Sequence, residues 1–123
     1  LIKPLGFDMD DAKLRRAGLD YHDLAHVTVH ENLDEALDQV PGRVWAFTGH
    51  AHTMHSEVAY ADGDGLLFGR ESVGLSSEAM THRRVEDLVR IHMVEGVRSL
   101  NLANSASIAL YEAWRQLGFP GGV

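Results

Sequence analysis

The sequence predicts an α/β fold with a mostly parallel sheet flanked by helices. Short runs rich in β-branched and aromatic residues alternate along the chain with segments of helical periodicity. Residues that cap or stop such elements, namely Asn, Ser, Gly and Pro, lie between the runs. The chain has 123 residues, of which 45% are hydrophobic and 24% charged. That length and composition are typical of one domain with its own hydrophobic core.

The first third of the chain is expected to hold two short strand segments and two helices. Residues 1–6 have the pattern of a strand end that runs into a turn, and 8–18 the pattern of a capped helix. The β-branched run at 26–30 predicts a strand. The acidic segment 32–40 predicts a helix, which a Pro-Gly pair ends.

The remainder continues the alternation. Strands are predicted at 43–47, at 66–68 and at 88–94, with a short helix at 76–80 between the last two. The chain closes with a helix within 97–122, whose first half is unusually rich in Ser and Asn.

The closing helix shows an apolar stripe at spacings of three and four. We expect these residues to be buried: Ala103, Ala106, Leu110, Ala113 and Leu117. Gly118 and Pro120 are expected to end the helix. The small residues of the stripe would allow another backbone to approach closely, or would serve only tight helix packing.

Charge and composition exclude several classes of protein. There is no cysteine, and no apolar run approaches the ~18 residues of a membrane span. We therefore expect a cytoplasmic protein with no membrane partner. The net charge of −7 has the wrong sign for binding nucleic acid through the bulk field, so phosphate contacts would have to come from local basic groups. Three such groups occur: Lys13 with Arg15 and Arg16, Arg83 with Arg84 and Arg90, and Arg98 with Arg115.

Two motifs raise the question of a ligand. Gly69 follows a predicted strand, at the edge where open α/β sheets bind ligands. The spacing of Gly69 and Gly74 matches a P-loop, but Leu75 stands where that loop requires Lys, and no G-x-G-x-x-G is present. The cluster of His50, His52 and His55 is read as a solvated loop, with a metal site as the less favoured alternative.

The segments GFDMDDAKLRRAGLDYH, LLFGRESVGL and IHMVEGVRSLNLANSASIALYEAWRQLGFPGG, in this order, resemble the SpoU branch of the SPOUT RNA methyltransferases. Within that branch the chain is most similar to small enzymes that methylate the ribose 2′-OH of the tRNA wobble nucleotide, C or U. The resemblance covers essentially the whole chain. It implies a deep trefoil knot in the C-terminal part, one of the few known exceptions to the rule against knots.

The resemblance also implies a site for S-adenosylmethionine. In the family the knotted loops hold this cofactor largely through backbone groups, and no metal is required. By position, the cofactor contacts fall on Phe47, Gly69, Ile91, Ser99 and Leu100. Glu71 and Asn101 match the family's polar catalytic positions; taken alone, Glu71 is either a surface charge or a buried polar partner.

Two departures from the family pattern are present. His92 stands where the family usually has Pro. The family's first strand and helix carry an Asn-x-Gly-Asn-Ile-x-x-Arg-like motif, and residues 1–123 do not contain it. We therefore expect that segment, with the Arg that helps to activate the ribose hydroxyl, upstream of Leu1.

The expected partners are tRNA, at its anticodon region, and a second copy of the chain. The family dimerises through its knot region, and Tyr111 and Trp114 of the last helix are expected at that interface. The alternative is a knotted dimer that binds a nucleotide or RNA without methylating it.

Overall fold

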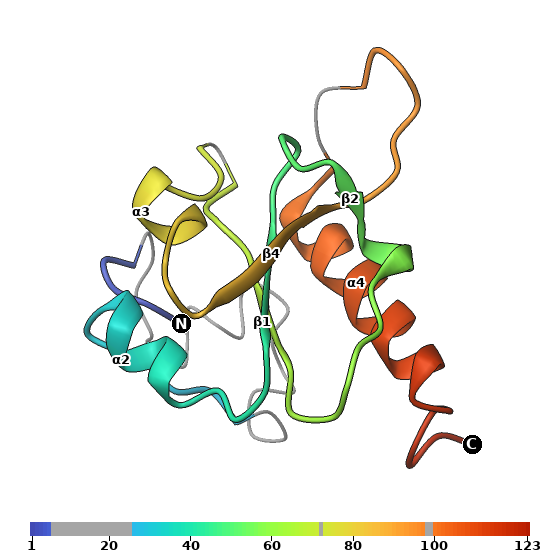
Figure 1. Ribbon diagram of the computed structural model, residues 1–123, viewed down its shortest axis with the longest axis horizontal. Coiled ribbons are helices and arrows are strands. Elements are labelled where there is room, and N and C mark those ends of the chain that lie inside the picture. The colour runs from blue at the N-terminus through green and yellow to red at the C-terminus, as the bar shows by residue number, and fades with distance from the viewer. Residues whose placement is uncertain (6–25, 72, 98–99) are drawn as a thin grey trace, which may run out of the picture. The chain divides into compact units, whose positions relative to one another are not determined.

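The computed structural model describes residues 1–5, 26–71, 73–97 and 100–123. They belong to two units, Leu1–Gln39 and Val40–Val123. Figure 1 labels elements of both units. The helix predicted at 8–18 lies outside the described residues.

In the first unit the predicted acidic helix is confirmed as α2, Leu33–Asp38. The side-chain oxygen of Asn32 accepts a hydrogen bond of 2.8 Å from the backbone N–H of Glu35. This N-cap satisfies one of the free N–H groups of the first turn, which explains why the helix begins where it does.

The strand end predicted within 1–6 is confirmed at Ile2, whereas the strand predicted at 26–30 is wrong in extent, because only His30 takes part in a bridge. They meet through one isolated parallel bridge, between Ile2 and His30. Two backbone hydrogen bonds hold it, from Lys3 N–H to the His30 carbonyl and from His30 N–H to the Leu1 carbonyl. The two segments therefore pair, but through a single residue of each.

The second unit is built on a four-stranded sheet in the order β2-β4-β1-β3. The strands are β1 Val44–Phe47, β2 Thr53–Met54, β3 Gly65–Leu67 and β4 Val85–Arg90. All three pairings are parallel, which confirms the predicted α/β class. Since the strands are parallel, their carboxyl ends lie at one edge of the sheet, where such folds bind ligands.

The bounds of β1 and β3 lie within one residue of the prediction, and the helix predicted at 76–80 is α3, Ser77–Met80, with Ser76 as its N-cap. The bounds predicted for β4 are wrong, because the strand begins at Val85 and ends at Arg90. Glu86 and Asp87 made the first half of this strand look like a loop. Asp87 is instead part of the sheet. Its carboxylate accepts a hydrogen bond of 3.0 Å from the Thr53 hydroxyl of the edge strand β2.

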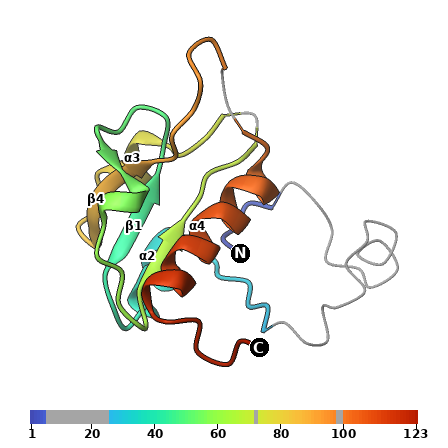
Figure 2. The same cartoon turned by 90° about the vertical axis from the view of Figure 1, so that its right-hand side faces the viewer.

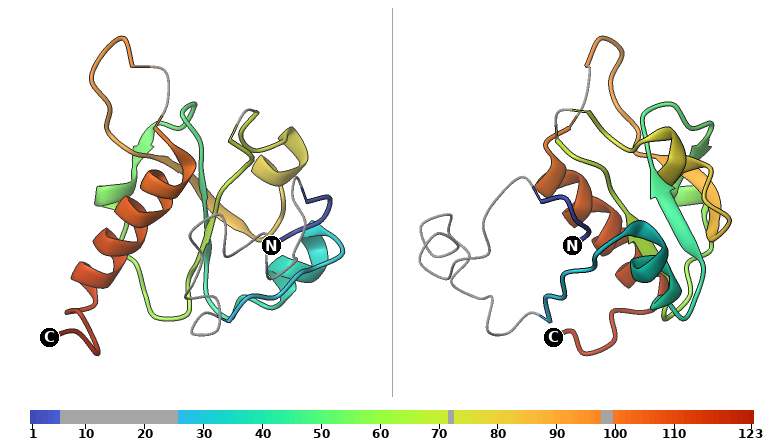
Figure 3. Two further views of the ribbon diagram at one scale, coloured as in Figure 1. Left: turned by 180° about the vertical axis from the view of Figure 1, so that it is seen from behind. Right: turned by 90° about the vertical axis from the view of Figure 1, so that its left-hand side faces the viewer.

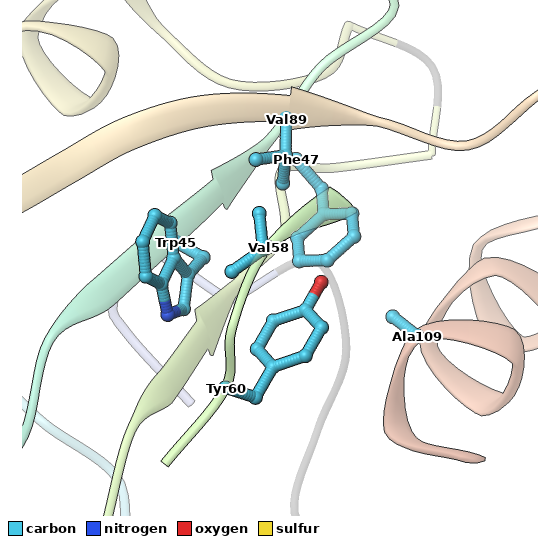
Figure 4. Close-up of a cluster of buried hydrophobic side chains, with 6 residues drawn as sticks. All are labelled: Trp45, Phe47, Val58, Tyr60, Val89 and Ala109. Carbon is cyan, nitrogen blue, oxygen red and sulfur yellow. The ribbon is translucent and has the colours of Figure 1, made fainter. Parts of the chain in front are cut away.

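A cluster of buried side chains lies between the sheet and the last helix, α4, Leu102–Gln116. Figure 4 shows its members: Trp45, Phe47, Val58, Tyr60, Val89 and Ala109. Trp45 and Tyr60 pack edge to face at 6.1 Å, a geometry that aromatic pairs favour. Figures 2 and 3 show α4 lying against this face of the sheet.

The buried stripe predicted for α4 is confirmed only in part, because Ala106 and Ala113 are half-buried but Ala103 is exposed. Ala109 is fully buried, whereas Leu110 and Leu117 are exposed. The aromatic rings of the sheet fill the space beneath the helix, so only a small side chain fits at closest approach. The predicted end of the helix is confirmed: Gly118 follows the C-cap residue with a φ of +86°.

Gln116 accounts for much of the orientation of α4. Its side-chain oxygen accepts a hydrogen bond from Tyr60 N–H, and its side-chain nitrogen donates to the Val58 carbonyl, both at 2.9 Å. A polar residue is therefore acceptable on the inner face of the helix, because it satisfies two backbone groups of a segment that lacks strand partners.

Candidate active site

A cleft of about 610 Å³ opens at the carboxyl ends of β1, β3 and β4. This volume lies in the range of small-molecule sites. The strand residues Phe47 and Arg90 line the cleft, together with the loops that follow β1, β3 and β4. The lining residues are 47–50, 68–71, 73–75, 80, 90–91, 93–97, 100, 102 and 105.

The structure brings most of the predicted site residues together around this cleft. Phe47, Gly69, Ile91 and Leu100 line it, and so does Glu71. They come from three loops that are far apart in the sequence, so their meeting depends on the parallel sheet. Ser99 lies outside the described residues.

Asn101 has a structural task at the edge of the cleft. Its side-chain oxygen accepts a hydrogen bond of 3.2 Å from Asn104 N–H and so caps α4. Asn101 itself does not line the cleft, although Leu100 and Leu102 on either side of it do. Since the cap uses only the amide oxygen, the side-chain NH₂ group is left to donate to a ligand.

The loop after β3 folds back on itself. Gly74 N–H donates a 2.8 Å hydrogen bond to the Arg70 carbonyl, and Gly74 has a φ of +69°, a conformation that favours glycine. A Cβ atom on Gly69 would overlap the backbone of Gly74 and Leu75. Glycine at position 69 is therefore required by the loop itself, whatever binds beside it.

Charged groups of both signs line the cleft. Glu71 and Glu95 are exposed at its rim, whereas Arg90 is half-buried. The sequence groups Arg90 with Arg83 and Arg84, but the hydrogen bonds of Arg84 give it a different role. Arg84 donates to the carbonyls of Val40 and Gly42, at 2.6 and 3.1 Å, and so serves the fold.

The three clustered histidines have three different environments. His50 lines the cleft and His52 is exposed, but His55 is buried in the short 3₁₀ helix η2, His55–Glu57. The prediction of a solvated loop is therefore wrong for His55. The pKa of His55 is lowered, mainly because burial disfavours the charged form. The nearby Glu112 acts in the opposite direction and raises it, whereas His92 lowers it further. Among the described residues no group of three or more His, Asp or Glu side chains is placed to hold a metal ion.

Sequence reasoning missed two features of the cleft. Gly49 lines it at the end of β1, and a Cβ atom there would meet no atom within 4 Å. Arg90 was noted only as one of a basic group. Its position at the last residue of a strand is the signal that could have identified it, but the predicted bounds of that strand ran past it. His92, the departure from the family pattern, is exposed and does not line the cleft.

A second hollow lies beside α4 and has a volume of about 470 Å³. It is lined by residues 60–64, 66, 110, 111, 113, 114 and 117. Leu110 is 61% exposed and Tyr111 62% exposed on this side of the helix. Trp114 packs edge to face against Tyr111, at 5.5 Å, and donates its indole N–H to the Pro120 carbonyl.

No helix in the described part of the chain has the length and apolar character needed to cross a membrane.

Comparison with known proteins gives a consistent result. The model of the SpoU rRNA Methylase family matches residues 1–111. Relatives from Saccharophagus degradans and Escherichia coli K12, both named tRNA (cytidine(34)-2'-O)-methyltransferase, are 47% identical. The matches cover 98% and 100% of this chain and 79% of each relative.

Solved structures agree in fold. One, described as giving structural insights into the 2-OH methylation of C/U34 on tRNA, has a TM-score of 0.86 and 42% identity, and the match covers 96% of this chain and 77% of that one. Another is the SpoU methyltransferase AviRb from Streptomyces viridochromogenes in complex with AdoMet. Its TM-score is 0.76 at 26% identity, over 95% of this chain and 48% of that one.

Proposed function

Because the chain belongs to the SpoU rRNA methylase family, we propose that it methylates the 2′-oxygen of a tRNA ribose with S-adenosylmethionine. The target is the wobble nucleotide of the anticodon, cytidine or uridine 34. The observation that supports this most directly is the 47% identity, over the whole chain, to a relative named for that reaction.

The residues of the cleft fit the cofactor. Phe47, Ile91 and Leu100 offer apolar surface for an adenosine group, and Gly49 leaves open space beside them. Backbone groups of the loop after β3 are exposed to the same cleft because Gly69 and Gly74 carry no side chain. We assign Phe47, Gly69, Ile91, Ser99 and Leu100 to cofactor binding; Ser99 is assigned by its position in the family motif alone.

The cofactor supplies an electrophilic methyl group on a sulfonium, and the protein must position the ribose hydroxyl and help to remove its proton. Glu71 is an exposed carboxylate at the rim of the cleft, so it can accept a hydrogen bond from a 2′-OH that approaches from solvent. Asn101 lies between two residues that line the cleft, and its NH₂ group, which the cap of α4 leaves free, would donate to the same ribose. We assign both residues to catalysis.

We further infer the deep trefoil knot of the SPOUT family, formed in the C-terminal part of the chain. The similarity to SpoU structures over 95% of the chain supports this. A knot would bring the loops that follow β3 and β4 together without a covalent link, and both of these loops line the cleft.

The proposed assembly is a homodimer, and the exposed apolar side of α4 supports it. Leu110, Tyr111 and Leu117 expose large apolar surfaces next to each other, around the second hollow. Such a patch marks an interaction site more often than a solvated surface. We assign it to a second copy of the chain, in the cytoplasm, where the substrate tRNA is modified.

The test is transfer of a labelled methyl group from S-adenosylmethionine to bulk tRNA, followed by nucleoside mapping. We expect label in 2′-O-methylcytidine or 2′-O-methyluridine at position 34, and a strong loss of label with Glu71→Gln. Label at another nucleotide would overturn the proposed substrate. Binding of tRNA with no transfer, by a protein that binds the cofactor, would favour the alternative of a non-catalytic RNA-binding dimer.

A further inference from the structure

Arg90 stands apart from the other arginines of the second unit. It is the last residue of β4, next to Val89, whose side chain is fully buried in the core under α4. Because successive side chains of a strand point to opposite faces, Arg90 is directed away from that core. Arg90 lines the cleft, as does Met80 of α3.

No partner of the Arg90 guanidinium is found among the residues that the structure describes. Its Nε atom is buried and has no hydrogen-bond partner, and no ion pair of Arg90 is present among the described residues. Arg43, Arg84 and Arg115, in contrast, all donate to carbonyl or carboxylate oxygens. A half-buried cation with an unsatisfied N–H group is costly, and the cost is removed when an anionic ligand supplies the missing acceptors.

We propose that Arg90 binds the carboxylate of the amino-acid part of the cofactor. This rests on the proposed function, since it deepens the cofactor site of that same cleft. A guanidinium presents paired N–H donors in a plane that matches the two oxygens of a carboxylate. Arg90 therefore sets both the affinity for the cofactor and the direction in which its amino-acid part lies.

A carboxylate fits this place better than a phosphate of the RNA. Arg90 lines the cleft and its Nε atom is buried, whereas the side chains of Glu71 and Glu95 lie exposed at the rim. A phosphodiester would have to pass these two carboxylates, which repel it, and the exposed Arg70, which also lines the cleft, is already engaged within the protein. A cofactor with a sulfonium and an ammonium group is attracted by those carboxylates and brings its own carboxylate to the arginine inside.

The experiment compares two ligands and three variants by calorimetry. The ligands are S-adenosylhomocysteine and its decarboxylated analogue, which lacks only the group that Arg90 would bind. The variants are Arg90→Met, Arg90→Lys and, as a matched control, Arg115→Met, which removes an arginine outside the cleft. Circular dichroism and thermal unfolding establish that each variant is folded.

We expect Arg90→Met to weaken S-adenosylhomocysteine binding by about 10- to 100-fold, which is the usual worth of hydrogen bonds to a charged group. Binding of the decarboxylated analogue should be weak in the wild type and no weaker in Arg90→Met. Arg90→Lys should lose less than Arg90→Met, because it keeps the charge but not the paired donors. Arg115→Met should bind both ligands as the wild type does.

Four results would overturn the inference, one of which requires tRNA binding to be measured as well. Unchanged S-adenosylhomocysteine affinity in Arg90→Met, with a wild type that binds, would refute it and leave the proposed function intact. Equal weakening of both ligands would make Arg90 a structural residue. Unchanged S-adenosylhomocysteine affinity together with weaker tRNA binding would assign Arg90 to an RNA phosphate. A wild type that binds neither ligand would refute the proposed cofactor as well.

Discussion

Gly69 and Gly74 lie so close together that a side chain on the first would overlap the carbonyl group of the second. A Gly69→Val variant should therefore open the loop after β3. We expect a lower melting temperature together with loss of S-adenosylhomocysteine binding, because the loop is both part of the fold and a wall of the cleft. A variant with normal stability and normal affinity would show that the loop tolerates a side chain there.

Gly49 offers a cleaner test of the cleft. It lines the same space, but a Cβ atom there meets nothing within 4 Å, so Gly49→Leu adds bulk without overlap of the backbone. We expect a melting temperature near that of the wild type and at least a 10-fold lower affinity for S-adenosylhomocysteine in calorimetry. Normal affinity would place the cofactor elsewhere.

Asp64 should make the stability of the protein sensitive to acid. Its side chain is only 6% exposed and accepts hydrogen bonds from the Trp45 indole and from the backbone N–H groups of Arg43 and Ala61. Burial alone would raise the pKa of Asp64, but these hydrogen bonds and the charge of Arg43 outweigh it, so the pKa is lowered. A lowered pKa stabilises the fold above the unfolded value near 4 and loses that effect as the pH falls through the native pKa.

Asp64→Asn should test this assignment, because it turns one acceptor into a donor that faces other donors. We expect a loss of about 2–3 kcal/mol in the free energy of unfolding at pH 7. The variant should also lose less stability than the wild type between pH 5 and pH 2 in urea unfolding. The exposed neighbour Asp62, changed to Asn, is the control and should behave as the wild type.

Gln116 should be sensitive to a change of one atom. Gln116→Glu keeps the acceptor for Tyr60 N–H but places a carboxylate oxygen against the Val58 carbonyl and beside the Glu112 carboxylate, 3.2 Å from the present amide nitrogen. We expect Gln116→Ala to lower the free energy of unfolding by about 2 kcal/mol at pH 7. Gln116→Glu should lower it further.

Part of that loss should return at lower pH, because a protonated carboxyl can donate to the Val58 carbonyl again. Chemical unfolding at pH 7 and pH 5 would measure it. Gln39→Glu, at the exposed C-cap of α2, is the control. Equal stability of Gln116→Glu and the wild type at pH 7 would mean that this side chain does not hold α4.

The exposed side of α4 should decide the oligomeric state. Leu110→Glu puts a charge into the apolar surface around the second hollow, and charges are depleted in interface cores. We expect light scattering at micromolar concentration to give a dimer for the wild type and a monomer for Leu110→Glu. Ile108→Glu, on the same helix but outside the hollow, should stay dimeric. A monomeric wild type would refute the proposed dimer.

The fold class could be predicted from the sequence because strand and helix patterns alternate clearly, and caps such as Asn32 and Ser76 mark the helix starts. The bounds of β4 could not, since Glu86 and Asp87 look like loop residues until the neighbouring Thr53 is known to pair with one of them. The inner face of α4 was predicted only in part, for a related reason. A helix that packs on aromatic rings buries its small Ala109 and leaves the larger Leu110 outside.

The cofactor residues were reachable from the sequence only through the family resemblance. Phe47, Gly69 and Leu100 share no pattern along the chain, and the cleft that unites them is formed by pairings between distant strands. The need for glycine at position 69 was equally invisible, because it arises from a backbone contact with Gly74 rather than from a ligand.

The strand order also bears on how the chain folds while the ribosome makes it. Among the described strands β2 pairs with β4 alone, and η2, β3 and α3 lie between the two in the sequence. Thr53 and Met54 therefore have no sheet partner until Val89 and Arg90 have left the exit tunnel. β1 and β3 can pair earlier, so a nascent chain that has left the tunnel only as far as residue 84 should expose residues 53–54 to proteases while residues 44–46 gain protection. Release of the segment up to Arg90 should close that edge in one step.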